Sequence, residues 1–193
     1  MFEYLKEFVV AAPPAGARYD YFVPVPVKQI EEAERRLGFK FPPLLRHFYE
    51  FIGHGNYVGK LAKEKYGALV SNEILHPRDV VEIYEGGGVY PSPFKFRRGQ
   101  LPFFQMMEDK YLTVKPKSAK PEAVYFRFGD ILIEANLDSF MRRLLDDPEF
   151  VDSVITAEWV RRDRVAAKAK KKTKRKTKEK ARKKLKSRVT KAK

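Results

Sequence analysis

The sequence predicts an α+β fold in which N-terminal and C-terminal helices pack on an antiparallel β-meander, followed by a basic tail that is disordered or transiently helical. Three observations predict it: two short amphipathic helices near the N-terminus, a run of short aromatic and β-branched strands, and a lysine-rich C-terminus. The elements run helices, strands, helices, which differs from the alternating strand–helix order of α/β proteins. We expect an irregular lead-in over residues 1–20, an α+β domain over 21–160 and a Lys/Arg-rich tail over 161–193.

The first predicted helix follows a lead-in made irregular by prolines. Ile30, Ala33 and Leu37 recur at i, i+3 and i+7 and form one apolar face. Gly38 can adopt the left-handed conformation that ends a helix. Glutamate–arginine pairs at i, i+4, each worth about 0.2–0.5 kcal/mol, are expected on the opposite face. These pairs are Glu31 with Arg35 and Glu32 with Arg36.

The second predicted helix starts at Pro42 or Pro43, because proline is tolerated in a first turn. Its wide apolar face consists of Leu44, Leu45, Phe48, Tyr49 and Ile52. Gly53 closes the helix, and Gly53–Asn56 is interpreted as a glycine-rich turn. Both helices are shorter than the roughly 12–15 residues that are already marginal in isolation, so they must pack on something else, which we expect to be a sheet.

That sheet is predicted downstream from segments enriched in aromatic and β-branched residues. The predicted strands are Leu101–Met106, Tyr111–Val114, Val124–Phe128 and Ile131–Glu134. Gly129–Asp130 is a two-residue connection of the kind that favours a hairpin. A final helix is then expected with Asn136 as its N-cap and with its end at Asp146–Pro148. Its apolar side is formed by Leu137, Phe140, Met141, Leu144 and Leu145.

Two sequence blocks resemble the SUKH superfamily, which includes yeast cell-wall regulators and many bacterial immunity proteins. The first block is Ile30-x-x-x-Glu34-x-x-Leu37-Gly38 followed by Phe41-Pro42-Pro43-Leu44-Leu45, and the second is Leu137-Asp138-Ser139-Phe140 at the head of the last helix. The resemblance spans about Tyr21 to Phe150. Phe41 stands where the family usually has leucine, and Gly53–Asn56 stands where an Asn-Gly turn is usual.

The resemblance implies a small α+β module that binds another protein. In a bacterium it implies neutralisation of a toxin, with nucleases as one class of target. The matching residues are interpreted as structural, so no binding site is carried over from them. These family-motif residues are Ile30, Glu34, Leu37, Gly38, Pro42, Ser139 and Phe140.

Charge is distributed very unevenly along the chain. The net charge is +15, with 40 lysine and arginine residues against 25 aspartate and glutamate residues. Residues 161–193 contain 19 basic and 2 acidic residues, which leaves 21 basic and 23 acidic residues in the first 160. The high isoelectric point therefore belongs to the tail, and the body is close to neutral.

The tail has too few large apolar residues to offset the backbone entropy of ordering, about 1–2 kcal/mol per residue. Residues 149–193 nevertheless contain no glycine or proline, so transient helix is expected once anions screen the charge. The tail is predicted to contact nucleic acid without sequence preference, because it carries dense lysines but neither base-reading motifs nor stacking aromatics. The candidate contacts are Lys168, Lys170, Lys171, Lys172, Lys174, Arg175, Lys176, Lys178 and Lys180.

No residue pattern predicts catalysis, a metal site or a cofactor. His47, His54 and His76 are not spaced as a metal-binding motif, and there is no cysteine. Gly86–Gly88 lacks the following Lys-Ser/Thr of a phosphate-binding loop and is interpreted as a helix stop. We therefore expect a protein without enzymatic activity. A saturable turnover that depends on His54 or His76 would favour an enzyme instead.

Two hypotheses about function follow. The first is a protein-binding module whose tail also contacts nucleic acid, and the second is a nucleic-acid-associated protein whose body serves as a tether. We expect no membrane partner, because no apolar run approaches the about 20 residues of a membrane span and the N-terminus lacks a signal-peptide pattern. The expected location is the cytoplasm, with nuclear or nucleoid association through the tail as the alternative.

Overall fold

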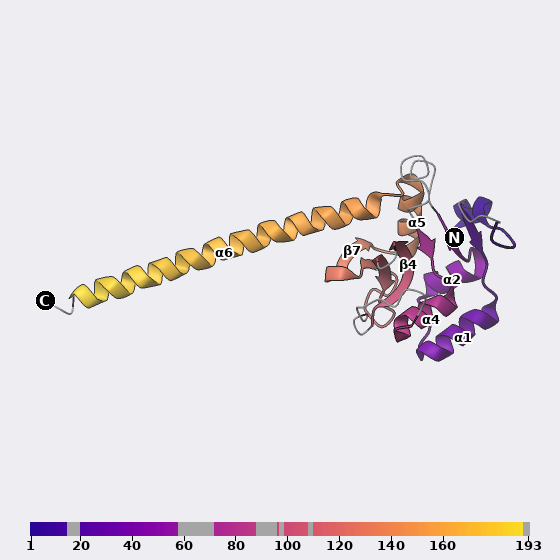
Figure 1. The fold of residues 1–193 in the computed structure, drawn as a ribbon, viewed down its shortest axis with the longest axis horizontal. Helices are drawn as coiled ribbons and strands as arrows, with labels where there is room; N and C mark the ends of the chain where they lie inside the picture. The colour runs from indigo at the N-terminus through magenta and orange to yellow at the C-terminus, as the bar shows by residue number, and fades with distance from the viewer. Residues whose placement is uncertain (15–19, 58–71, 88–95, 97–98, 108–109, 191–193) are drawn as a thin grey trace. The chain divides into compact units, whose positions relative to one another are not determined.

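The computed structural model describes residues 1–14, 20–57, 72–87, 96, 99–107 and 110–190 (Figure 1). The chain divides into two compact units, residues 1–152 and 153–193. The helices are η1 (Glu3–Phe8), α1 (Val27–Leu37), α2 (Pro43–Phe51), α4 (Pro77–Glu85), η3 (Phe128–Asp130), α5 (Leu137–Asp146) and α6 (Phe150–Thr190). The strands are β1 (Tyr21–Val23), β2 (His54–Asn56), β3 (Glu73–Ile74), β4 (Leu101–Met107), β5 (Lys110–Val114), β6 (Val124–Phe126) and β7 (Ile131–Glu134).

The seven described strands form one sheet whose spatial order is the same as their order along the chain. Every neighbouring pair is antiparallel, so the sheet is a meander and the predicted α+β class is confirmed. The prediction missed the first three strands. No strand was predicted over Tyr21–Val23, and the segment of β2 was interpreted as a glycine turn, because both strands are only three residues long.

One row of side chains across the sheet forms the centre of the core. The strand register aligns Phe22, Gly55, Ile74, Phe104, Leu112, Phe126 and Ile131 on neighbouring strands. All of these positions are buried. Phe22 packs edge-on against Phe48 of α2 at 5.7 Å between ring centroids, and Phe104 packs against Phe140 of α5 at 5.1 Å. This row therefore faces the helices.

The glycines around β2 are required by the closeness of β1. A Cβ atom on Gly53 would lie 1.7 Å from the carbonyl oxygen of Val23, and one on Gly55 would lie 2.1 Å from that of Tyr21. Both glycines also have positive φ angles, 110° and 151°, which side-chain-bearing residues rarely adopt. The segment interpreted as a turn is therefore a strand. Its glycines allow it to pair this closely with β1.

The β6–β7 connection is longer than predicted. β6 ends at Phe126, two residues before the predicted end, and a short 3₁₀ segment follows. Gly129 and Asp130 have φ angles of 76° and 57°, so both predicted turn residues adopt left-handed conformations. The hairpin was predicted correctly, but its connection spans residues 127–130.

Three donors surround the buried carboxylate of Glu34 and join α1 to α2. The Glu34 side chain is 2% exposed, and it accepts hydrogen bonds from Lys40 Nζ at 2.8 Å, Arg46 Nη1 at 2.6 Å and the Phe41 backbone N–H at 3.0 Å. Burial alone would raise the pKa of Glu34, but these three hydrogen bonds together outweigh it and lower the pKa. Glu34 therefore remains ionised and fixes the connection between the two helices.

The ends of the helices follow the predicted signals. Gly38 ends α1 with a φ angle of 72°, and Pro43 occupies the first position of α2. Asn136 caps α5 by accepting the backbone N–H of Ser139 at 2.9 Å. The predicted i, i+4 pairs on α1 are replaced by other pairs, because Arg36 reaches Glu85 of α4 at 2.7 Å and Arg35 lies 3.9 Å from Glu32.

The last helix, α6, continues from Phe150 to Thr190 without a break. In its N-terminal part, the Glu158 carboxylate accepts hydrogen bonds from Arg161 at 2.6 Å and from Arg162 at 2.8 Å, both about one turn further along the helix. The unbroken helix agrees with the absence of glycine and proline after residue 149. Among the described residues, no helix combines the length and apolar character needed to cross a membrane.

Replacing Glu34 tests how much the buried carboxylate stabilises the fold. Glu34→Gln keeps the shape but removes the charge that Arg46 and Lys40 approach, so we expect a loss of about 2 kcal/mol in the free energy of unfolding. Urea denaturation of the full chain measures it.

Glu31→Gln is the matched control, because Glu31 is 59% exposed and lies 4.0 Å from the same Arg46. Glu31→Gln should lower the free energy of unfolding by less than about 0.5 kcal/mol. Equal effects of the two substitutions would contradict the role assigned to Glu34.

Candidate functional site

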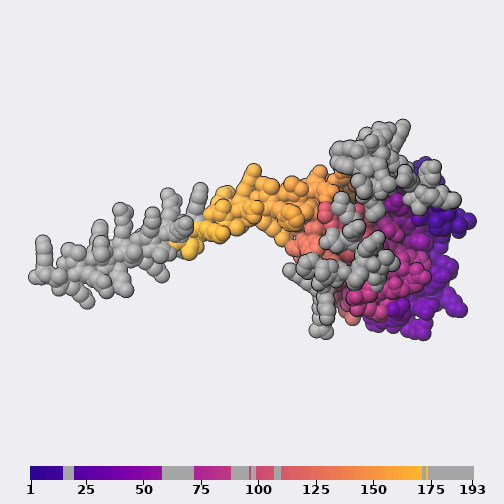
Figure 2. Space-filling view, in the orientation of Figure 1, coloured from indigo at the N-terminus to yellow at the C-terminus, as the bar shows by residue number. Residues whose placement is uncertain are grey.

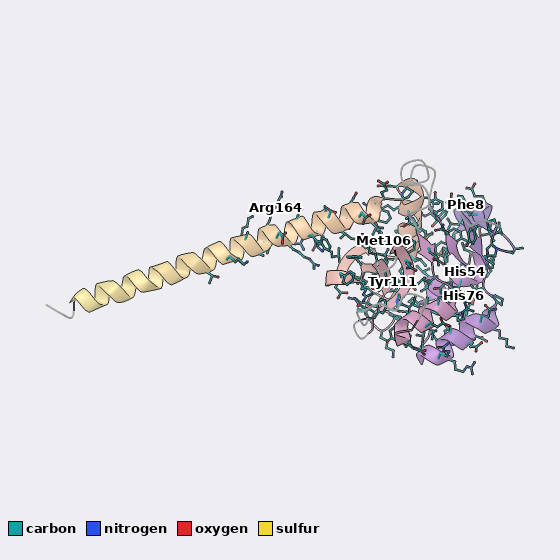
Figure 3. The ribbon with its side chains drawn as sticks, in the orientation of Figure 1. Phe8, His54, His76, Met106, Tyr111 and Arg164 are labelled. Carbon is teal, nitrogen blue, oxygen red and sulfur yellow. The ribbon has the colours of Figure 1, made fainter. Side chains whose placement is uncertain are left out.

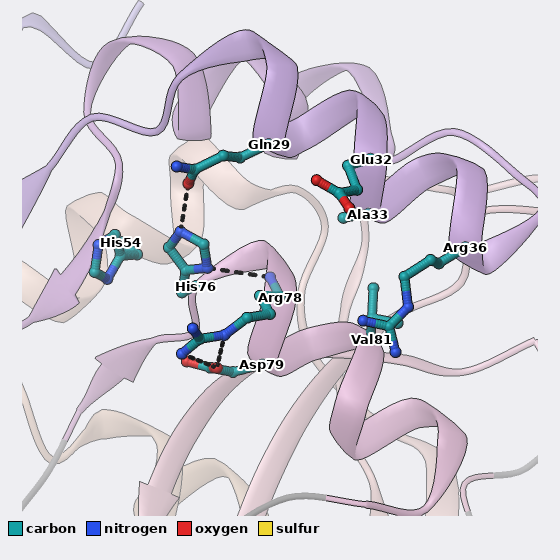
Figure 4. Close-up of a pocket in the computed structure, with 9 residues that line it drawn as sticks. All are labelled: Gln29, Glu32, Ala33, Arg36, His54, His76, Arg78, Asp79 and Val81. Carbon is teal, nitrogen blue, oxygen red and sulfur yellow. Dashed lines mark hydrogen bonds and ion pairs between the residues drawn. The ribbon is translucent and has the colours of Figure 1, made fainter.

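A pocket of about 520 Å³ lies between α1, β2 and α4 within residues 1–152 (Figure 4). In Figure 2 the purple segment that contains α1 lies next to the magenta segment that contains α4, and the two helices contact each other. The residues lining the pocket are Gln29, Glu32, Ala33, Arg36, His54, His76, Arg78, Asp79 and Val81. It therefore combines two histidines with charged side chains at one concave surface.

The imidazole of His76 is held by two hydrogen bonds. Its Nδ1 atom accepts the backbone N–H of Arg78 at 3.1 Å, which caps the start of α4. Its Nε2 atom lies 3.0 Å from Oε1 of Gln29 on α1. A ring nitrogen that accepts from a backbone N–H carries no proton, so the geometry assigns the proton to Nε2, which donates to Gln29. His76 therefore contributes a neutral ring in a fixed orientation.

The ring of His54 lies beside that of His76, with their centroids 4.7 Å apart and their planes at 87° (Figure 3). Burial, and next the nearby His76, lower the pKa of His54 to about 4. Burial also lowers the pKa of His76. Both rings are therefore uncharged near neutral pH and add no positive charge to the pocket.

The charged side chains around the two rings are already paired. Arg78 Nε lies 3.3 Å from Asp79 and 3.9 Å from Glu82, while Arg36 reaches Glu85 at 2.7 Å. Within the described part of the chain, no three histidine, cysteine or acidic side chains are grouped so that they could hold a metal ion. The pocket is suited to receiving part of a ligand through hydrogen bonds and shape.

The structure brings together two histidines that the sequence analysis kept apart. His76 is the N-cap of α4, and this helix ends at Gly86, where the sequence predicted a helix stop. His54 was assigned to a turn, so its approach to His76 could not be predicted. Recognising β2 as a strand beside β3 would have provided the missing signal, since β3 leads directly to His76.

The family-motif residues lie in the core and at helix ends, away from the pocket lining. Ile30 and Phe140 are completely buried, Pro42 is the N-cap of α2, and Gly38 ends α1. Ser139 lies in the first turn of α5, where its backbone N–H is capped by Asn136. The motif thus identifies residues that build the fold.

The candidate nucleic-acid contacts all belong to α6. Lys168 and Lys170 are exposed. The side chains of the other candidates lie outside the described residues, namely Lys171, Lys172, Lys174, Arg175, Lys176, Lys178 and Lys180. The structure thus places the tail candidates on one helix of the second unit, residues 153–193.

Comparison with known proteins finds a family model and a relative that match this chain. Residues 24–143 match the model of the SMI1 / KNR4 family (SUKH-1). A protein from Bacillus subtilis (strain 168) named "Immunity protein YxxD" is 26% identical over 138 residues, which cover 67% of this chain and 86% of the relative. No solved structure gives a significant match.

The lowered pKa of His54 predicts that the fold weakens in mild acid. In the unfolded chain histidine takes up a proton as the pH falls through about 6.5, whereas folded His54 resists until the pH reaches about 4. Between pH 7 and pH 5 the free energy of unfolding should therefore fall by about 2 kcal/mol through this residue. Denaturant unfolding across that range measures the slope.

His54→Gln should flatten the pH dependence, because the variant lacks the group that only the unfolded state protonates. If the free energy of unfolding falls equally with pH in the wild type and in His54→Gln, then His54 is not the source of the pH dependence.

Proposed function

This chain belongs to the SMI1/KNR4 family (SUKH-1), and on that premise we propose that it is a non-enzymatic, immunity-type module that binds and neutralises a protein toxin. The observation that carries this proposal is the extent of the match. The family model covers residues 24–143, which include every described strand from β2 to β7 and the helices α1, α2 and α4. The similarity therefore concerns the folded body and not the basic tail.

The relative supports the immunity role. It is named an immunity protein, and 86% of its length aligns with this chain. The pocket supports a binding role over a catalytic one, because His76 is fixed by a backbone N–H and by the neutral side chain of Gln29. A general base is usually oriented by a group that stabilises its protonated form, and these two partners do not do so.

We further propose that the toxin neutralised by this module acts on nucleic acid. The tail carries 19 basic residues against 2 acidic ones, and such a block binds polyanions by releasing counterions. A tail of this kind would concentrate the chain on the same polymer that a nuclease attacks. The binding module and the tail would then serve one task in the cytoplasm.

A second candidate function is association with nucleic acid through α6, with the body as a tether. It is favoured by the exposure of the described lysines Lys168 and Lys170. It places the main functional element in residues 153–193 and makes the protein partner secondary.

Capture of partner proteins tests the immunity proposal. The tagged full chain is used to isolate proteins from its host with nuclease present, and a captured candidate is then expressed with and without the chain. We expect one discrete partner that survives nuclease treatment and whose toxicity is suppressed by co-expression, since protein contacts do not depend on nucleic acid. Loss of every partner after nuclease treatment would favour the tether hypothesis.

Deleting residues 164–193 tests the role of the tail. The full chain should bind duplex DNA with a log–log salt slope of about −0.9 for each phosphate contacted, and the deletion should abolish that binding. Partner capture should persist, because the family match ends before the deleted residues. Salt-independent binding, or binding retained by the shortened chain, would contradict the assignment of nucleic-acid contact to the tail.

A further inference from the structure

Uncharged residues recur at every fourth position along the basic part of α6. Between residues 168 and 188, the positions that separate them are all basic except for Glu179 and Ser187. The backbone is a single helix across this stretch, so the sequence repeat can be placed on the helix surface. The recurring uncharged residues are Val165, Ala169, Thr173, Thr177, Ala181, Leu185 and Val189.

This period of four divides the helix surface into four rows. Each residue of an α-helix is turned by about 100° from the one before it, so positions four apart follow one another in a row and neighbouring rows lie about 90° apart. We call the row of recurring residues the uncharged row, the two rows beside it the flanking rows, and the fourth the opposite row.

The flanking rows hold 11 of the 14 basic residues between positions 168 and 188, and they hold no acidic residue. One flanking row contains Lys172 and Lys176, and the other contains Lys170 and Lys174. The opposite row has three basic residues and is interrupted by Glu179. A helix that lies on a flat polyanion gains most from basic residues on one side. Here two basic sides are separated by an uncharged one, which fits a ligand with two negative walls and a space between them.

The described residues at the start of the repeat agree with this pattern. Lys168, Ala169 and Lys170 are exposed, so the first lysine of each flanking row lies in solvent on either side of the uncharged row. Thr173 is exposed as well, and its Oγ1 donates a hydrogen bond to the Ala169 carbonyl oxygen at 3.1 Å. This hydroxyl is thus satisfied by the backbone of its own helix, one turn earlier in the same row.

The major groove of duplex DNA is a ligand of this shape. It is about 12 Å wide, admits an α-helix and runs between two phosphate backbones. Alanine and threonine in the uncharged row are small enough for the helix to approach the base pairs, and contacts from basic residues to phosphates fix a protein on the duplex. The major groove of duplex RNA is deep and narrow, so it does not admit a helix in this way.

We propose that the basic part of α6 lies in the major groove of duplex DNA, with its uncharged row toward the base pairs and its flanking rows toward the two phosphate backbones. The proposal rests on the nucleic-acid contact proposed above for the tail, and it adds the form of nucleic acid, the groove and the orientation of the helix. The rows turn about the helix axis by about 40° per repeat. A straight helix therefore keeps this orientation over about three repeats, for example from Ala169 to Ala181.

Two double variants of the full chain that lose the same charge test the orientation. Lys172→Gln with Lys176→Gln removes two charges from a flanking row. Lys171→Gln with Arg175→Gln removes two from the opposite row, each at the preceding residue. Glutamine has a helix propensity close to that of lysine, so the helix itself should be unaffected.

Binding of each variant to a duplex DNA of about 30 base pairs is measured by fluorescence anisotropy over a range of salt concentrations. The flanking-row variant should make the log–log salt slope shallower by about 1.8, because each lost phosphate contact removes about 0.9. The opposite-row variant should change the slope by less than about 0.5. Equal changes in the two variants would show that the tail binds as an unoriented polycation and would overturn the proposal.

Duplex RNA of the same length tests the groove. We expect the full chain to bind duplex DNA at least about fivefold more tightly than duplex RNA, because only the DNA groove admits the helix. Equal or tighter binding to duplex RNA would rule out the major groove.

These measurements separate failure of this proposal from failure of the proposed function. If the full chain does not bind duplex DNA even at low salt, the nucleic-acid contact of the tail is wrong and this proposal falls with it. Partner capture by the body still decides the immunity role in that case. If the full chain binds duplex DNA but the two double variants behave alike, the tail still contacts nucleic acid and only the orientation of α6 in the groove is wrong.

Discussion

The buried carboxylate of Glu34 is the interaction on which the N-terminal half of the body depends. It collects one backbone and two side-chain donors from the connection after α1 and from α2. A buried charge is tolerated only when its hydrogen bonds are complete, so α1 and α2 have one relative arrangement in which Glu34 is satisfied. That arrangement places Gln29 and Arg36 of α1 along one wall of the pocket and brings Gln29 to His76.

Polar groups in the described part of the body fall into two physical states, those with a hydrogen-bond partner and those without one. Glu34 and His76 have partners within the chain and hold elements together. Asn56, on the short strand β2, keeps a buried side-chain oxygen without a hydrogen-bond partner. A folded chain usually satisfies its buried polar atoms, so this oxygen is an exception, which it shares with the Tyr49 hydroxyl and one Glu122 oxygen among the described residues. Asn56 lies on β2, the strand that also contributes His54 to the pocket.

Periodicity predicted the elements whose stabilising contacts repeat along the chain. The faces of α1, α2 and α5 were predicted from apolar spacing, and β4, β5 and β7 from runs of aromatic and β-branched residues. The first three strands were missed because they contain three, three and two residues, and β2 has glycine at its centre. Their pairing depends on backbone hydrogen bonds between distant segments, which leave no periodic trace in the side chains. The pocket was missed for the same reason, since its lining includes His54 of β2.

The sequence by itself determined the α+β class, the helix ends at Gly38, Pro43, Asn136 and Gly86, the family resemblance, and the separation of a near-neutral body from a basic tail. Each of these follows from local spacing or composition. Tertiary structure alone decided that Glu34 is buried among three donors, that His54 meets His76, and that Asn56 and Glu73 stand side by side. These relations join residues that are far apart in the chain, and only the pairing of strands and the packing of helices bring them into contact.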